Sequence, residues 1–171
     1  MGEPTADALK IFSLTNKQNT SLSILNYGAA IHSFQMLDKN RNFVNIIVSP
    51  KHTEAYFKPE YKKHNKCFGA SVGRYAGRIS NGGFILGDKT FSLKQKDGVH
   101  LHGGENGFQY KFWKLEEEVD GENPSVKLSY LSDDGEEGYP EKLKVEVSYT
   151  LTENNELLIE YSATTDKETV I

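Results

Sequence analysis

Short runs in which apolar and polar side chains alternate recur along most of this chain, and they constrain its fold more than any other feature. Successive side chains of a β-strand point to opposite faces, so this alternation predicts strands with one buried face. The clearest runs are Val126, Leu128, Tyr130; Val145, Val147, Tyr149, Leu151; and Leu157, Ile159, Tyr161, Ala163. No segment of ten or more residues has a helical period, and the nearest, residues 53–63, is interrupted by Pro59. We therefore expect an all-β fold, an antiparallel β-sandwich or barrel of many short strands.

Other segments favour strands joined by tight turns. Residues 43–48 form a mostly apolar run that predicts a buried strand. Residues 84–86 and 90–93 flank a Gly-Asp-Lys sequence at 87–89, where glycine can supply the positive φ of a hairpin turn. The Glu-Asn-Asn sequence at 153–155 predicts another tight turn, between the last two alternating runs.

The C-terminal residues Thr169-Val170-Ile171 have the composition of a further strand, for which the sequence offers no partner. A bare apolar edge strand is an aggregation hazard. We therefore expect that the chain continues in the natural protein or that something covers this open C-terminal edge, for instance by pairing with another chain.

Composition narrows the class of protein. The chain has 171 residues, which suits a single domain, and its net charge of −4 lacks the basic field that nucleic acid requires. No apolar run is long enough to span a membrane, and the polar residues 1–7, expected to be a flexible tail, do not resemble a signal peptide. The lone cysteine, Cys67, allows no internal disulfide. These features predict a cytoplasmic protein without nucleic-acid or membrane partners.

The segment HLHGG is the first candidate site, because His100 and His102 would face the same side of a strand. Two such imidazoles can bind zinc, but a catalytic zinc needs a third ligand, and the spacing of His32, His52 and His64 marks none of them. We therefore predict no metal site. A neutral imidazole could instead hydrogen-bond a ligand hydroxyl or ring oxygen, or the histidines could satisfy backbone carbonyls at a strand end. The residues alone leave these last two interpretations open.

A glycine-rich segment at 69–83 carries Arg74 and Arg78 and does not match a phosphate-binding loop. The guanidinium fork suits neighbouring sugar hydroxyls or a carboxylate, so the segment could bring arginines into a cleft. Pairing with a structural acid is the commoner case. The acidic turn SDDGEEGYP at 132–140 could supply a pair of carboxyl groups that act as acid and base, as in glycoside hydrolysis. Acidic residues grouped in such a turn are more often simply exposed to solvent.

These segments together resemble the aldose 1-epimerase (galactose mutarotase) family, in the family's order. The matching pieces are NYGA, FGASVGRYAGRISNGGF, HLHGGENGFQYKFW, SDDGEEGYP and YTLTENNELLIEYSATTDKETVI. The resemblance covers nearly the whole chain from about residue 8 and is confined to the N-terminal half of the family's chains. It implies that residues 1–171 are a partial aldose 1-epimerase domain, an incomplete copy of a large antiparallel β-sandwich with a sugar cleft across one sheet.

The resemblance also implies a function. The family interconverts the α- and β-anomers of hexoses such as galactose and glucose without a cofactor. A base takes the proton of the anomeric hydroxyl, an acid protonates the ring oxygen, and the ring opens and closes on its other face. Arg78 matches the family's sugar-binding arginine and His102 its first active-site histidine, which polarises the sugar. His100 lies where the family varies, so it receives no role.

Two departures from the family bear on activity. Gly77 stands where the family often has Asn, so one polar contact at the cleft is absent. The family's acid histidine, its sugar-binding Asp and its base Glu have no counterpart in this sequence, so we expect weak or no activity from this chain alone. The alternative is a non-catalytic carbohydrate-binding or regulatory protein, in which Phe108 and Trp113 would add a platform beside Arg78 and His102.

Overall fold

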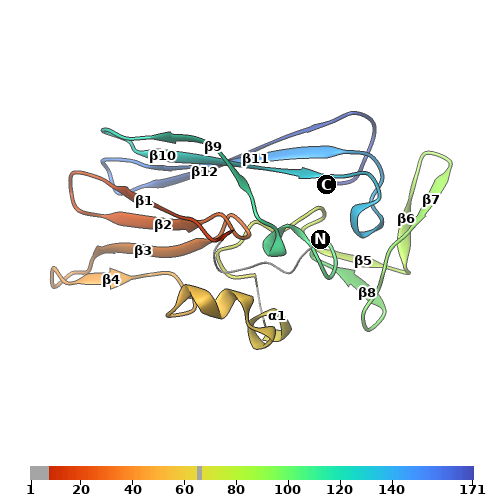
Figure 1. Cartoon of the computed structure of the whole chain (residues 1–171), viewed down its shortest axis with the longest axis horizontal. Coiled ribbons are helices and arrows are strands. Elements are labelled where there is room, and N and C mark those ends of the chain that lie inside the picture. The colour runs from red at the N-terminus through yellow and green to blue at the C-terminus, as the bar shows by residue number, and fades with distance from the viewer. Residues whose placement is uncertain (1–7, 65–66) are drawn as a thin grey trace.

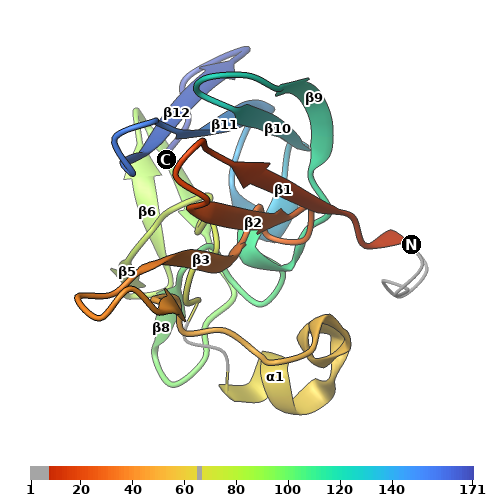
Figure 2. The same ribbon diagram turned by 90° about the vertical axis from the view of Figure 1, so that its left-hand side faces the viewer.

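The computed structural model describes residues 8–64 and 67–171, so the expected tail at 1–7 lies outside the described residues. Two four-stranded antiparallel sheets pack face to face (Figures 1 and 2). The first sheet has the order β1-β2-β3-β4, from strands Ile11–Thr15, Ser21–Leu25, Ile31–Leu37 and Phe43–Asn45. The second has the order β12-β11-β10-β9, from strands Leu157–Thr165, Leu143–Leu151, Ser125–Ser132 and Lys114–Val119. The predicted antiparallel β-sandwich is confirmed.

Two small strand pairs extend one end of the sandwich (Figure 1). One pairs β5 (Arg78–Ser80) with β8 (Val99–Leu101), and the other is the predicted hairpin of β6 (Gly83–Leu86) and β7 (Lys89–Ser92). Gly87 occupies its turn with φ of +60°, a conformation that glycine adopts without strain.

The helical segments are all short. They are the 3₁₀ turns η2 (Thr53–Phe57), η3 (Phe108–Tyr110) and η4 (Glu136–Gly138), and the helix α1 (Pro59–His64), which lies outside the sandwich (Figure 2). Pro59 divides η2 from α1 as predicted; at the first position of α1 its missing N–H breaks no helical bond. Within residues 8–64 and 67–171, no helix has the length and apolar character needed to cross a membrane.

The core lies between the sheets and is built by alternate residues of their central strands. Among the apolar side chains that these strands bury completely between the sheets are Leu22, Ile24, Val126, Leu128, Val147 and Leu151. The hydroxyl of Tyr149 on β11 donates to the carbonyl of Ala29, 2.6 Å away, and so joins the second sheet to the turn between β2 and β3. The alternation in β10 and β11 therefore predicted the buried face correctly.

Two of the edge strands, β4 and β12, contradict the prediction of burial. Residues 43–48 do not form a buried strand: β4 ends at Asn45 and Phe43 is 52% exposed. In β12 the alternating residues Ile159 and Tyr161 point the same way as buried residues of β11, yet they are 43% and 58% exposed. Both strands lie at the ends of their sheets, and no described element packs over them closely enough to bury these side chains.

The C-terminal residues also differ from the expectation of a further strand. Residues 169–171 are not in a strand; instead the Thr169 hydroxyl donates to the carbonyl of Pro140 over 2.6 Å and accepts from Arg74 over 3.2 Å. The C-terminal edge strand of the second sheet is β12, and β9 forms its other edge. The predicted turn at 153–155 joins β11 to β12, with Asn155 at φ of +62°.

We predict that truncating the core of β10 destabilises the protein far more than truncating β12. Leu128→Ala removes a fully buried side chain and should lower the free energy of unfolding by about 2–5 kcal/mol. Ile159→Ala, on the face of β12 that continues the buried face of β11 but 43% exposed, should cost about 1 kcal/mol or less. Urea denaturation followed by far-UV circular dichroism measures both values. Equal decreases in the free energy of unfolding would contradict the conclusion that this face of β12 is exposed.

Candidate functional site

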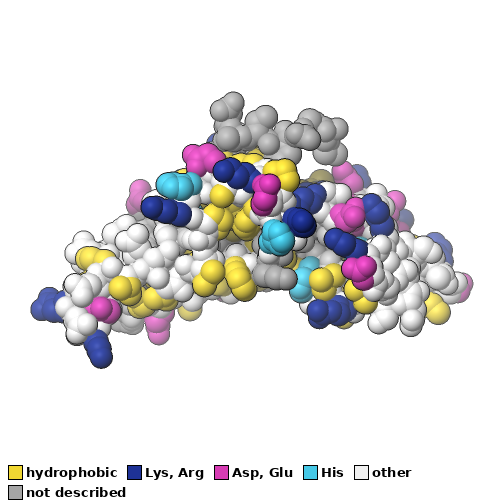
Figure 3. Space-filling view, turned by 90° about the horizontal axis from the view of Figure 1, so that it is seen from below, with side chains coloured by type: hydrophobic (Ala, Val, Ile, Leu, Met, Phe, Trp, Pro, Cys, Tyr) yellow, Lys and Arg dark blue, Asp and Glu magenta, His cyan; other side chains and the backbone are white. Residues whose placement is uncertain are grey.

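A hollow of about 680 Å³ opens between α1, the β7–β8 connection and the loop that follows β8. This volume is within the range of small-molecule sites, about 300–1,000 Å³. Its wall is formed by Pro59, Lys62, Lys63, Cys67, Lys94, Gln95, Lys96, Asp97, Val99, Leu101, His102, Gly104, Glu105, Gln109 and Tyr110. Figure 3 looks onto the face that carries α1 and β8, where basic, acidic and histidine side chains gather near the middle.

His102 belongs to the wall of this hollow and is half-buried. Its N–H donates to the carbonyl of Gly77 over 2.8 Å, and its carbonyl accepts from the Gln109 amide over 3.2 Å. Its φ of +51° is left-handed, so it follows β8 without continuing the strand. Its buried Nδ1 has no hydrogen-bond partner among the described residues.

His100 has different surroundings. It is fully buried in β8, its Nδ1 donates to the carbonyl of Lys94 over 2.8 Å, and its ring meets the edge of Tyr139. It does not line the hollow. The expectation that the two imidazoles share one face was wrong, because the left-handed backbone at His102 ends the strand alternation. Within the described part of the chain, no cluster of three or more His, Cys, Asp or Glu side chains is arranged for a metal ion.

The two arginines of the glycine-rich segment also differ. Arg78 begins β5 opposite Leu101, next to His102, but its side chain is exposed and is not part of the hollow's wall. Arg74 is 5% exposed and donates to the carbonyls of Ser132, Asp133, Pro140 and Glu141 and to the Ser132 hydroxyl. Arg74 therefore has a structural role, holding the end of β10 and the loop that follows it.

The acidic turn is more ordered than its composition predicted. Glu136 forms an ion pair with Lys111 and accepts hydrogen bonds from the Ser132 hydroxyl and, over 2.7 Å, from the Tyr130 hydroxyl. Burial raises the pKa of Glu136, but these hydrogen bonds outweigh burial and lower the pKa of the carboxyl overall. The expectation of solvated acids was wrong for this residue, although Asp133 and Asp134 are exposed.

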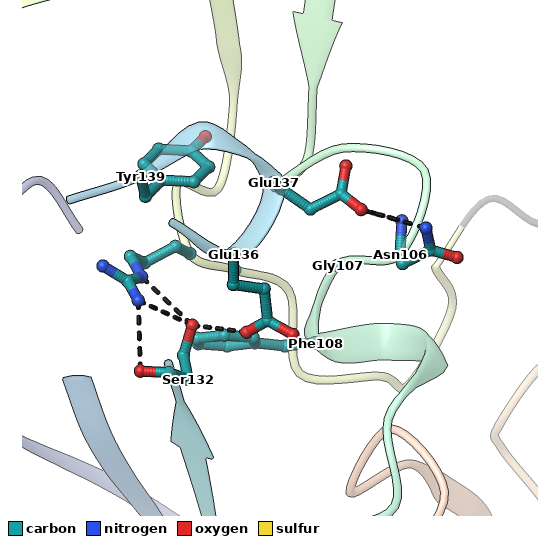
Figure 4. A pocket seen from close by; sticks show the side chains of 10 residues that line it. Asn106, Gly107, Phe108, Ser132, Glu136, Glu137 and Tyr139 are labelled. Carbon is teal, nitrogen blue, oxygen red and sulfur yellow. Dashed lines mark hydrogen bonds between the residues drawn. The ribbon is translucent and has the colours of Figure 1, made fainter. Parts of the chain in front are cut away.

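Glu137 fixes the loop that carries His102. One carboxylate oxygen accepts from the backbone N–H and the side-chain amide of Asn106, and the other accepts from the N–H of Glu105, all over 3.0–3.1 Å. Figure 4 shows Glu137 reaching across to Asn106 while Glu136 points toward Ser132. The space between these groups is about 10 Å³, room for a single water and not for a sugar.

Sequence reasoning did not single out Gln109 or the lysines of the wall, and it misplaced two aromatic residues. Gln109 is 4% exposed, and its amide oxygen has no hydrogen-bond partner within the described residues. It stands in the segment that resembles the family, but no spacing rule singled it out. Phe108 and Trp113, expected as a sugar platform, are both buried in the core between the sheets. Neither residue lines the hollow, so a ligand bound there cannot stack on their rings.

Comparison with known proteins gives a consistent result. The family described as "Aldose 1-epimerase" matches residues 10–171. The aldose 1-epimerase of Haemophilus influenzae is 34% identical over 169 residues, which are 98% of this chain and 46% of that protein. The galactose mutarotase of Mus musculus is 34% identical over 161 residues, which are 94% of this chain and 44% of that protein.

Solved structures agree with the relatives. A homologue of aldose epimerases from C. elegans superposes with a TM-score of 0.82 at 27% identity, over 94% of this chain and 47% of that one. The galactose 1-epimerase of Lactobacillus acidophilus has a TM-score of 0.79 at 32% identity, over 94% of this chain and 46% of that one. The chain therefore spans about half the length of the relatives that it matches.

We predict that the two arginines contribute very differently to stability. Arg74→Met leaves several buried carbonyl groups without a donor and should lower the free energy of unfolding by at least about 2 kcal/mol. Arg78→Met, the matched control at an exposed position, should change it by about 0.5 kcal/mol or less. Chemical denaturation of the purified variants tests this, and wild-type stability in Arg74→Met would refute the structural role.

Proposed function

Because the chain belongs to the aldose 1-epimerase family, we propose that it forms the sugar-binding part of a site that interconverts the α- and β-anomers of a hexose such as galactose or glucose. The observation that carries this proposal is the position of His102 in the wall of the hollow, with a ring nitrogen that has no partner among the described residues. The hollow is large enough for one monosaccharide.

The chemistry of the wall supports a polyhydroxylated ligand. An imidazole nitrogen of His102 and the amide oxygen of Gln109 are buried without partners in the described chain. Leaving a buried polar atom unpaired costs about 1–3 kcal/mol. Sugar hydroxyls both donate and accept hydrogen bonds, so a bound hexose could satisfy both types of group. Tyr110 adds an aromatic surface at the same wall.

Arg78 is the proposed second contact to the sugar. It stands on the strand next to His102, its side chain is exposed, and its guanidinium forms no ion pair with any described residue. An unpaired, exposed guanidinium on this strand can hold two neighbouring hydroxyls with its fork of donors. In this proposal His102 polarises the sugar and Arg78 orients it.

Proton transfer requires further groups. The carboxylates on and beside the His102 loop are already engaged: Glu105 by Lys94, Glu136 by Lys111 and Tyr130, and Glu137 by the loop itself. None of the three is free to take a proton from an anomeric hydroxyl, and Asp97, the other carboxylate of the wall, is exposed to water. We infer that the acid and the base of the reaction are not among the residues of this chain, which spans less than half of its relatives' length.

We predict that this chain binds galactose but does not interconvert its anomers at an appreciable rate. Absence of either proton-transfer group should lower turnover by about 10²–10⁴ relative to a full-length relative. Polarimetry on freshly dissolved α-galactose measures turnover, and isothermal titration calorimetry measures binding. His102→Ala should abolish binding, whereas His52→Ala, at an exposed histidine outside the hollow, should not change it.

The two measurements separate the parts of this proposal. Turnover close to that of a full-length relative would show that the acid and base are present after all. Equal affinity of the wild type and His102→Ala for galactose would remove His102 from the site.

We also propose that the open edge of β12 pairs with β12 of a second copy of this chain. An antiparallel pair centred on Tyr161 would place Ile159 opposite the partner's Ala163 and Glu160 opposite the partner's Ser162. This register brings the exposed apolar side chains together and keeps the two carboxylates from facing each other.

We predict from this register that the protein has twice the mass of its 19.2 kDa chain in size-exclusion chromatography with light scattering. Tyr161→Lys would place two ammonium groups opposite each other and should give the monomer mass. Leu131→Lys changes an exposed apolar residue on β10 and is the control that should remain a dimer. A wild-type chain that is strictly monomeric would exclude the pairing.

A further inference from the structure

Four lysine side chains line the hollow from two separate segments of the chain. Lys62 and Lys63 come from α1, and Lys94 and Lys96 come from the connection between β7 and β8. Among the described residues of the same wall, the carboxylates are those of Asp97 and Glu105, so the lysines outnumber the acids and the wall carries net positive charge. The whole chain, in contrast, has a net charge of −4. The positive charge of the hollow is therefore a local feature of the fold.

The lysines concentrate their charge within one small region. The pKa of Glu105 is lowered, first by a hydrogen bond from Lys94 and then by the charges of Lys94, Lys62 and Lys96. Lysines from both segments thus act on a single exposed carboxylate. Opposed walls that carry the same charge create a field that attracts an ion of opposite sign.

Two of the four ammonium groups are engaged by the protein. Lys94 forms an ion pair with Glu105, and Lys62 donates to the Asn106 side chain over 3.1 Å and lies over the ring of Tyr110. Lys63 and Lys96 form no ion pair with any residue in 8–64 or 67–171. One unpaired ammonium group therefore stands on each side of the hollow.

We propose that the sugar taken by this hollow carries an anionic substituent, a carboxylate or a phosphate ester, which Lys63 and Lys96 bind. This inference rests on the proposed function, because His102 and Gln109 would bind the hydroxyls of the sugar ring. The ammonium groups add recognition of negative charge to the hydrogen-bonding groups of His102 and Gln109. Lysine binds phosphate and carboxylate as a compact point charge and does not require a fixed geometry.

The proposal is tested by calorimetric titration of the chain with galactose, galacturonate, galactose 6-phosphate and inorganic phosphate. At low salt, at least one anionic sugar should bind about tenfold more tightly than galactose, and the difference should shrink at high ionic strength. The tighter of the two anionic sugars identifies the substituent as carboxylate or phosphate.

Matched double variants locate the contact. Lys63→Gln with Lys96→Gln should lower the affinity for the anionic sugar about tenfold and leave the affinity for galactose unchanged. The control, Lys39→Gln with Lys51→Gln, removes two exposed lysines outside the hollow and should leave both affinities unchanged.

The outcomes separate this inference from the proposed function. If galactose binds as tightly as both anionic sugars, the charge recognition is overturned and the proposed function stands. If inorganic phosphate binds as tightly as galactose 6-phosphate, the lysines attract anions without selecting a sugar, and the inference is overturned as well. If no sugar binds, the proposed function itself fails.

Discussion

The buried guanidinium of Arg74 holds together the parts of the molecule on which the hollow depends. It satisfies the carbonyls at the end of β10 and in the loop before β11, and it reaches Thr169 near the C-terminus. A buried charge is tolerated only when hydrogen bonds replace the water that it has lost. Arg74 therefore fixes the neighbouring backbone, whose Gly73 carbonyl accepts from the N–H of Phe108 over 3.0 Å.

The loop after β8 can approach that backbone because of one glycine. Gly103 has φ of +75°, and a Cβ at this position would lie 1.7 Å from the carbonyl oxygen of Gly73. No other residue fits there without moving the backbone. The preceding residue, His102, is held by the Gly77 carbonyl of the same segment. The side chain that the proposed function depends on is thus positioned by contacts between two backbone segments, one of which carries Arg74.

The sequence predicted the strands well and their surroundings less well. Alternation in β10 and β11 identified the buried face because both strands are central, with a second sheet packed over them. The same pattern in β12 indicated which face is apolar but could not show that no described layer covers it. The prediction that His100 and His102 face the same side was wrong, because the spacing of residues in a sequence does not show that one of them has a left-handed backbone. The resemblance to a family singled out His102, whereas Gln109 and the lysines of the wall needed the fold, which brings distant segments together.

The loop between His102 and Gln109 links the acidic turn at 132–140 to the wall of the hollow. Asn106 donates from its amide to Glu137 and accepts from Lys62, so a chain of hydrogen bonds runs from η4 to α1. Glu105, next to it, donates its backbone N–H to Glu137 and pairs its carboxylate with Lys94. Glu137 of the 132–140 turn therefore acts on the hollow indirectly, by fixing the loop whose side chains hold two of its lysines. Ordering these groups before a ligand arrives lowers the entropy lost on binding.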